Sequence, residues 1–232
     1  MALICKNQTI KGSFNNFVMD YSNEGDMFIG NYLKLSPIIV LDIDETLVHY
    51  DFDNHLIYFR PGLNSFLWEI HHYFRICLFT AGTEKHAIDA INAINKFCNF
   101  KQNEIIEYVL DRRFMSEYEK GGGTIKIKDL YSVNEYILNE TLKDVKLTPL
   151  QKHSTIIKSL QKTIIVDNIM DNYINYINNG INIIDFTNSI NDMALYIIKR
   201  FLLDYICQIK IIDTNADHYI INNIHKIKNA IQ

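Results

Sequence analysis

Short apolar runs alternate with stretches of helical periodicity along most of the chain. Three runs are rich in β-branched residues and end abruptly in polar residues, which is typical of buried strands in a parallel sheet. They are Pro37–Leu41, Phe74–Phe79 and Thr163–Val166, and a shorter run covers Ile181–Asp185. Helix-like stretches lie at Leu63–His71, Glu84–Lys96, Val133–Leu142, Pro149–Leu160, Asp192–Ile206 and Tyr219–Ala230. This alternation predicts an α/β fold, a Rossmann-like parallel sheet with helices on both faces.

Two further pairs of β-rich segments interrupt this alternation. Leu47–Tyr50 and Leu56–Phe59 flank a polar cluster and predict a hairpin flap that lies beside the end of the first strand. Its turn carries a D-x-D that follows no buried strand, so a solvated turn is favoured there over a metal site. Ile105–Leu110 and Thr124–Lys128 have Gly121–Gly123 between them, which indicates a flexible turn.

The composition narrows the class of protein. The chain has 232 residues, 48% hydrophobic and 22% charged, which suits one sizeable globular domain. The net charge of −4 gives no support for direct binding to nucleic acid or to a membrane surface. Four cysteines lie far apart without a C-x-x-C, which favours reduced thiols in an intracellular protein.

Targeting signals add little to this picture. No apolar run reaches the ~18 residues that a membrane span needs. The first residues lack the apolar core of a secretory signal. We therefore expect an intracellular, soluble protein, and both the cytoplasm and the nucleus stay open. Residues 1–35 are polar and weakly patterned, and they are interpreted as a leader that packs on the domain edge or is partly disordered.

Two aspartates end the first buried strand. Asp42 and Asp44 are separated by one residue, and side chains at i and i+2 of a strand point the same way. Both carboxylates should therefore face one side at the carboxyl end of the strand, where open α/β sheets bind their ligands. Two carboxylates so placed need a partner for their charge, and a divalent cation is the simplest one.

The other two buried strands also end in polar residues. Phe74–Phe79 runs into Thr80 and then into small residues before a helix, an arrangement that can hold phosphate oxygens, with Thr83 as the expected N-cap. Thr163–Val166 runs into Asp167 and Asn168. Asp171 and Asn172 repeat that pair, and this second pair is interpreted as helix capping.

Five motifs carry a resemblance to a known family. In order they are D-x-D-x-T-L-V from Asp42, R-P-G from Arg60, F-T-A-G from Phe79, K-D-L from Lys128 and V-D-N from Val166. Each motif after the first is weak alone, but the ordered set is specific. The chain from about Pro37 to Ile206 resembles the haloacid dehalogenase superfamily. Within it, the chain is most similar to the phosphatases that act on the C-terminal domain of RNA polymerase II.

The resemblance implies a phosphoric monoester hydrolase with a haloacid dehalogenase-like fold. Asp42 would attack phosphorus and become an aspartyl-phosphate. Asp44 would protonate the leaving oxygen and then activate water to cleave that intermediate. The cofactor would be Mg²⁺, held by Asp42, the backbone carbonyl of Asp44 and Asn168, with water and phosphate completing its octahedron.

Four more residues receive roles from the resemblance. Thr80 and Lys128 would bind the phosphoryl oxygens. Asp167 would orient Lys128 or a metal-bound water, and Thr46 would brace the loop. In this family the V-D-N motif continues with Ser and Pro, whereas this chain has Ile169 and Met170.

The resemblance also implies a partner and a division of the chain. The partner would be a phosphorylated protein or peptide, with the C-terminal domain of RNA polymerase II as one candidate. Residues 36–206 would form the phosphatase domain, with a small β insertion at about 100–128. Residues 207–232 would be a helical extension, for which packing within the chain is favoured over partner binding.

Two other functions stay open at this point. The chain could be a relative that kept the fold and lost catalysis, although none of the expected reactive positions is substituted. It could also be a phosphatase of the same superfamily that acts on a small metabolite or a nucleic-acid end. The β insertion and the R-P-G segment favour the phosphoprotein branch.

Overall fold

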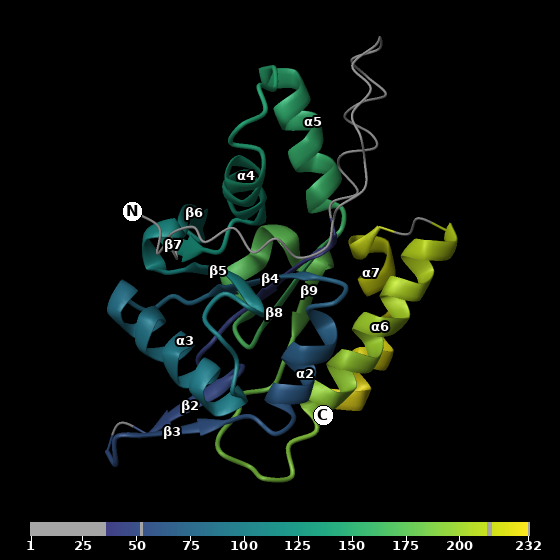
Figure 1. Ribbon diagram of the computed structural model, residues 1–232. Helices are drawn as coiled ribbons and strands as arrows, with labels where there is room; N and C mark the ends of the chain where they lie inside the picture. Colours follow the sequence, from purple (N-terminus) through teal and green to yellow (C-terminus); the bar gives the residue numbers. More distant parts are fainter. Residues whose placement is uncertain (1–35, 52, 213–214, 232) are drawn as a thin grey trace.

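A computed structural model describes residues 36–51, 53–212 and 215–231 (Figure 1). The expected leader at residues 1–35 lies outside the described residues. At the centre is a five-stranded sheet in the order β5-β4-β1-β8-β9, and every neighbouring pair is parallel. Its strands are β1 Ile38–Leu41, β4 Arg75–Phe79, β5 Ile106–Leu110, β8 Thr163–Asp167 and β9 Gly180–Asn182. The predicted parallel α/β sheet is confirmed.

The alternation of side chains along β1 divides the core into two layers. Ile39 and Leu41 belong to a large cluster on one face, while Ile38 and Val40 belong to a smaller cluster on the other. The large cluster includes residues of α2 Leu63–Ile70, α3 Glu84–Cys98, α6 Ala194–Ile212 and α7 Ala216–Ile231. The smaller one includes residues of α4 Leu130–Thr141 and of the 3₁₀ segment η2 Met170–Asn179. Helices therefore cover both faces, as predicted.

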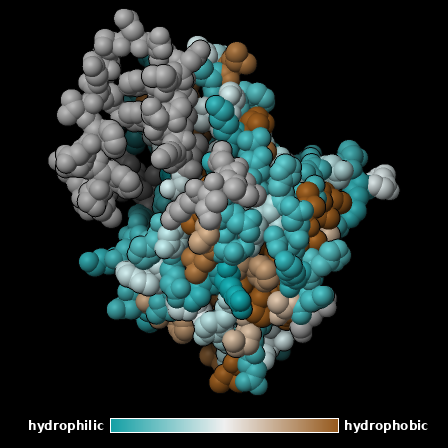
Figure 2. All heavy atoms as spheres, turned by 90° about the vertical axis from the view of Figure 1, so that its right-hand side faces the viewer, coloured by the Kyte–Doolittle hydropathy of each residue, from teal (hydrophilic) through white to brown (hydrophobic). Residues whose placement is uncertain are grey.

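The helix pairs give the molecule its outline. In Figure 1, α4 and α5 Pro149–Leu160 project at the top of the view, and α6 and α7 run together along the right-hand side. Figure 2 shows this right-hand side, which is largely hydrophilic with apolar patches between the polar residues. Among the residues that the structure describes, no helix is both long enough and apolar enough to cross a membrane.

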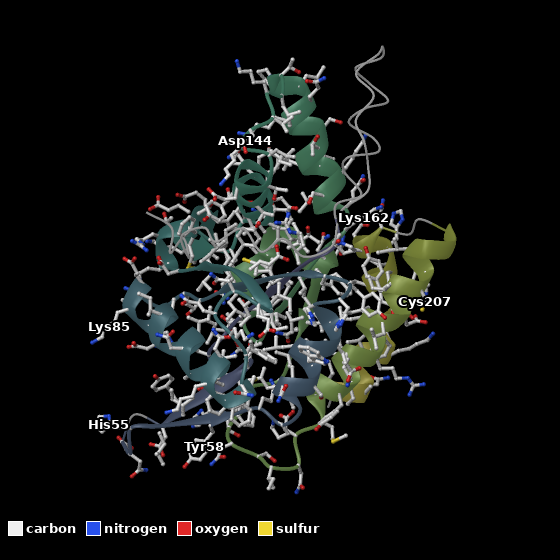
Figure 3. All side chains as sticks on the ribbon, viewed as in Figure 1. His55, Tyr58, Lys85, Asp144, Lys162 and Cys207 are labelled. Carbon is white, nitrogen blue, oxygen red and sulfur yellow. The ribbon has the colours of Figure 1, made fainter. Side chains whose placement is uncertain are left out.

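The predicted flap is present as an antiparallel hairpin of β2 Val48–Asp51 and β3 Leu56–Phe59. His55 and Tyr58, labelled at the lower left of Figure 3, show where it projects from the domain. The ring of Phe59 stacks on Phe97 of α3 with centroids 4.1 Å apart. This contact fixes the hairpin against the helix that starts beside the carboxyl end of β4.

The structure corrects the assignment of the β insertion. Residues Ile106–Leu110 form β5, the edge strand of the main sheet, and do not belong to the insertion. The insertion's hairpin consists of β6 Ser116–Lys120 and β7 Gly123–Ile127, preceded by a 3₁₀ turn at Arg112–Phe114. The strand β6 was not predicted because its side chains are almost all polar and it borders solvent.

The end of the chain packs against the domain. Residues Tyr219, Ile220 and Ile227 of α7 are at most 1% exposed and join the large core cluster. The expectation that this helix packs within the chain is confirmed. The helix α6 begins at Ala194, two residues later than predicted, because Asp192 accepts a hydrogen bond from the backbone N–H of Ala194. The predicted strand Ile181–Asp185 is shorter and shifted, as β9.

Candidate active site

Apart from Lys128, the predicted site residues end or follow neighbouring strands of the central sheet. The register pairs Leu41 of β1 with Leu78 of β4 and with Val166 of β8. The residues that follow these positions therefore meet at one edge of the sheet, the carboxyl edge. The backbone N–H of Asp42 donates to the carbonyl of Val166 at 3.0 Å, which continues the ladder into the site.

A buried cation lies between two carboxylates. The Nζ atom of Lys128 is 2.5 Å from Oδ1 of Asp42 and 2.6 Å from Oδ2 of Asp167, and Lys128 and Asp167 are fully buried. The chain places Lys128 directly after β7, where its backbone N–H donates to the carbonyl of Asn172 at 2.5 Å. Lys128 is thus held at both its backbone and its side chain.

The cluster shifts the pKa values of Asp42 and Lys128. Burial raises the pKa of Asp42 to about 6, with Lys128 opposing the rise and Asp167 adding to it. Burial also disfavours the charge on Lys128, but Asp42 and Asp167 outweigh it and raise the Lys128 pKa. Lys128 therefore stays protonated. Two carboxylates, those of Asp42 and Asp167, face this one ammonium, and such an arrangement favours binding of a further cation.

The second aspartate occupies a different environment. Oδ2 of Asp44 accepts a hydrogen bond from the hydroxyl of Thr80 at 3.0 Å, and Oδ1 lies 2.7 Å from Nε2 of His86. Burial raises the pKa of Asp44, but these hydrogen bonds outweigh burial and lower it. Thr80 in turn accepts a bond from the backbone N–H of Gly82 at 2.8 Å. The two aspartates thus have oppositely shifted pKa values.

His86 is a site residue that the sequence reasoning missed. It lies in the first turn of α3, where the predicted N-cap Thr83 accepts a hydrogen bond from the His86 backbone N–H. In the sequence, a single histidine with no cysteine or acidic cluster at metal-ligand spacing gives no signal of a site. Its place one turn into the helix that follows the Thr80 loop is the feature that could have identified it.

A short chain of hydrogen bonds fixes the amide of Asn168. The hydroxyl of Thr46 donates to Oδ1 of Asn168 at 3.3 Å, and Nδ2 of Asn168 donates to Asp185 at 3.0 Å. From β9, Asn182 donates to the backbone carbonyls of Asp167 and Asn168 at 3.2 and 2.7 Å. The amide oxygen of Asn168 is thereby oriented towards the loop that follows β1.

The interpretation of Asp171 and Asn172 as a capping pair was wrong in part, because Asp171 lies in the first turn of η2 as expected but neither side chain caps it. The segment η2 has Ile169 at its N-cap and no side-chain cap. Asn172 donates to both carboxylate oxygens of Asp167 at 3.1 Å, so it supports the site directly. Asp171 forms an ion pair with Lys120 of β6 at 2.6 Å and ties the insertion to this segment.

Arg60 of the R-P-G motif is a structural support for the site. Its side chain is fully buried and forms an ion pair with Asp192 at 2.8 Å. It also donates to the backbone carbonyls of Thr46 at 3.0 Å and Ile184 at 2.9 Å. Arg60 therefore joins the loop after β1 to the segment between β9 and α6.

The donor atoms at the carboxyl edge fit Mg²⁺. They are the carboxylate of Asp42, the amide oxygen of Asn168 and the carbonyl oxygen of Asp44, all of them hard oxygen ligands. Within the described part of the chain, no hydrogen bond uses the carbonyl of Asp44. The described residues also hold no group of three histidine, cysteine or acidic side chains placed to bind a metal. A Mg²⁺ ion would depend on this mixed set together with water and phosphate.

Comparison with known proteins gives one family match. The family model described as NLI interacting factor-like phosphatase matches residues 37–211. A search of curated proteins finds no match.

Two solved structures match parts of the chain. One is Fcp1, an essential RNA polymerase II CTD phosphatase, with 15% identity and a TM-score of 0.41; the match covers 67% of this chain and 43% of that one. The other is a fission yeast Fcp1 variant bound to beryllium fluoride, with 14% identity and a TM-score of 0.41, covering 84% and 56%. The matches span about half the length of these two proteins.

Proposed function

Because the chain belongs to the NLI interacting factor-like phosphatase family, whose members are phosphoric monoester hydrolases, we propose that it is a Mg²⁺-dependent phosphoprotein phosphatase that works through an aspartyl-phosphate on Asp42. One observation carries the proposal. The ammonium of Lys128 bonds to Oδ1 of Asp42 and not to Oδ2. Among the described residues, Oδ2 has no hydrogen-bond partner, and it is not a fully buried atom. This oxygen is therefore open towards the site.

In the first step, Oδ2 of Asp42 attacks phosphorus. The bond between phosphorus and the serine or threonine oxygen breaks, and Asp44 gives its proton to that leaving oxygen. The negative charge of the bound phosphate favours the protonated form of Asp44, since a like charge nearby raises the pKa of a carboxyl group. The ammonium of Lys128 keeps the rest of the Asp42 carboxylate in place.

In the second step, water attacks phosphorus of the aspartyl-phosphate. Asp44, now ionised, takes a proton from this water, and the bond between phosphorus and Oδ2 of Asp42 breaks. Inorganic phosphate leaves, Asp42 is a carboxylate again and Asp44 is protonated, so that all atoms and charges return to the starting state.

The remaining residues bind the phosphoryl group and orient the reacting side chains. The hydroxyl of Thr80 would turn from Asp44 to a phosphoryl oxygen, and Lys128 would balance the charge of the transferring group. Asp167 fixes the position of the Lys128 ammonium, and Asn172 donates to Asp167 and accepts a hydrogen bond from the backbone N–H of Lys128. Bound Mg²⁺ would be held by Asp42, Asn168 and the carbonyl of Asp44, and would favour ionised Asp42 while offsetting negative charge on the phosphoryl group.

The proposed substrate class is a phosphorylated protein or peptide. The hairpin β6–β7 and the R-P-G segment are the features that support this class over a small metabolite, since both resemble the phosphatases of the RNA polymerase II C-terminal domain. That domain is one candidate substrate. A phosphoserine or phosphothreonine peptide presents the monoester at the end of a short side chain that must reach the carboxyl edge of the sheet.

The test uses the purified full chain and an aryl phosphate with and without Mg²⁺. We expect Mg²⁺-dependent turnover, its loss in Asp42→Asn, and inhibition by beryllium fluoride, which mimics an acyl phosphate. Asp53→Asn, in the exposed D-x-D of the flap, is the matched control and should retain turnover. Turnover by Asp42→Asn would remove Asp42 as the nucleophile. A panel of phosphoserine peptides, nucleotides and sugar phosphates then tests the substrate class.

A further inference from the structure

Asp44 has one hydrogen-bond donor for each of its two carboxylate oxygens. The hydroxyl of Thr80 lies 3.0 Å from Oδ2 and Nε2 of His86 lies 2.7 Å from Oδ1. We infer that His86 is a positioning residue that holds Oδ1 of Asp44, so that Oδ2 is the atom that exchanges a proton with the leaving group and with water. This inference rests on the proposed phosphatase function.

Three contacts leave the ring of His86 little freedom. The backbone N–H of His86 is bonded to the N-cap Thr83, which sets the start of α3. On one side lies Gly82, where an added Cβ would stand only 2.6 Å from Cδ2 of His86. On the flap side, the ring of Tyr50 is tilted against the imidazole with centroids 5.4 Å apart. The close approach to Gly82 means that the backbone of the Thr80 loop is fitted to this ring.

The arrangement separates the two oxygens of Asp44 by function. Thr80 is predicted to turn towards a phosphoryl oxygen when substrate binds, and this movement would release Oδ2. His86 belongs to a helix rather than to the phosphate loop, so its bond to Oδ1 can persist through both steps. A carboxyl group held at one oxygen cannot rotate its other oxygen away from the reacting atom. Such positioning lowers the barrier because the orientation is fixed before the reaction.

An ordinary half-exposed ion pair would predict a different behaviour. The side chains of His86 and Asp44 are 22% and 39% exposed, and pairs of this kind generally contribute little to stability. If the pair were only a surface contact, its loss would affect all substrates alike or not at all. If His86 positions the proton donor, its loss must slow the first step most for substrates whose leaving group needs that proton.

The experiment compares His86→Leu and His86→Gln with the wild-type chain on a series of phosphate monoesters. The series runs from p-nitrophenyl phosphate, whose leaving group departs without full protonation, through phenyl phosphate to a phosphoserine peptide. For His86→Leu we expect kcat/KM on the peptide to fall about 100-fold, the low end of the contribution of one positioned acid. The ratio kcat/KM is the measured quantity because it reports formation of the aspartyl-phosphate, whereas hydrolysis of that intermediate is common to all substrates. The loss on p-nitrophenyl phosphate should be much smaller. His86→Gln keeps an N–H donor and should recover part of the loss.

Lys85→Ala is the matched control, because Lys85 is the neighbouring exposed residue of α3 and points away from the domain in Figure 3. It should behave as wild type throughout the series. An equal loss of kcat/KM on all substrates, or none, in His86→Leu overturns the inference while leaving the phosphatase assignment intact, as long as the wild-type protein is active.

A second measurement does not depend on turnover. The Nε2–H resonance of His86 in nuclear magnetic resonance should move when Asp44 is changed to Asn, because its hydrogen-bond acceptor changes. An unmoved resonance overturns the inference. Absence of turnover by the wild-type chain on every monoester would overturn the proposed function, and the role of His86 would fall with it.

Discussion

The ammonium of Lys128 lies 2.5 Å from Oδ1 of Asp42, and both side chains are buried at the carboxyl edge of the central sheet. The two residues are 86 positions apart in the sequence. Two carboxylates, those of Asp42 and Asp167, share this one cation. The charge states of Asp42 and Lys128 therefore depend on this cluster, and several measurable consequences follow from its geometry.

Replacing Lys128 should damage both the fold and the activity. Lys128→Met leaves two buried carboxylates without their partner, so we expect the free energy of unfolding to fall by about 3–5 kcal/mol. We also expect kcat to fall about 100- to 1,000-fold, because the cation facing the phosphoryl group is lost. Urea denaturation and a steady-state assay measure the two effects. Lys126→Met, two residues earlier in β7 and exposed, should be nearly neutral; similar losses in both variants would contradict the prediction.

Asn168 and Asn172 should behave differently although they are four residues apart. Asn168→Ala removes a proposed Mg²⁺ ligand, so the Mg²⁺ concentration for half-maximal activity should rise at least about 10-fold. Asn172→Ala removes only the bonds to Asp167, so it should lower kcat with an unchanged Mg²⁺ requirement. A Mg²⁺ titration of the activity of each variant distinguishes a metal ligand from a residue that only supports Asp167. An unchanged requirement in Asn168→Ala would exclude this residue from the metal site.

Gly82→Ala should reproduce part of the effect of losing His86. The new Cβ would lie 2.6 Å from the His86 ring and 3.0 Å from the Thr80 hydroxyl, so the ring must move. In a double-mutant cycle with His86→Leu, the losses in kcat should therefore be less than additive, because the two changes remove the same contact. Gly123→Ala, where an added Cβ meets only one backbone atom at 3.9 Å, is the control. Fully additive losses would show that Gly82 acts independently of His86.

The helix α7 lies outside residues 37–211, which the family model matches, yet it completes the core. Ile220→Ala should lower the free energy of unfolding by about 2–5 kcal/mol, because this side chain is 1% exposed. Its neighbour Ile221 is 47% exposed, and Ile221→Ala should cost about 1 kcal/mol or less. Chemical denaturation of the two variants provides the comparison. Equal effects would mean that α7 is not docked on the domain as described.

Asp111 should contribute to the pH dependence of stability. Burial opposes its ionisation, but hydrogen bonds from Arg113 outweigh burial and hold the pKa of Asp111 below its usual 3.8. Because the native state binds this proton less readily than the unfolded state, ionised Asp111 stabilises the protein above the unfolded pKa and loses that effect as the pH falls. The free energy of unfolding, measured by denaturation from about pH 6 down to about pH 3, should therefore fall more steeply for the wild type than for Asp111→Asn. Parallel curves would contradict this.

The sequence was most informative where hydrophobicity alone determines structure. The strands β1, β4 and β8 were predicted because their apolar runs are buried on both faces, and each is confirmed at almost the predicted bounds. The start of α5 at Pro149 and the Thr83 cap of α3 were predicted because capping depends on neighbouring residues only. The proximity of Asp42 to Asp167 followed from the rule that parallel strands end at one edge.

Contacts between distant segments were harder to predict. Nothing near His86 in the sequence indicates that its imidazole meets Asp44, which is 42 residues away. Arg60 was noted as part of a motif, but its bonds to Asp192 and to backbone carbonyls depend on the path of the chain 132 residues later. The strand β6 gave no signal because, among the strands that the structure describes, it pairs with β7 alone, and it faces solvent. These features depend on tertiary geometry, which residue patterns do not encode locally.

The strand order has a consequence for how this chain can change in length. Between β5 and β8 the chain leaves the sheet to form the β6–β7 hairpin, α4 and α5, and the α4–α5 connection, marked by Asp144 in Figure 3, stands at the top of the view. The distance between Asp42 and Asp167 is set by the pairing of Leu41 with Val166, and not by the length of the chain between β5 and β8. Residues can therefore be added or lost in that connection while the reacting groups keep their mutual distances.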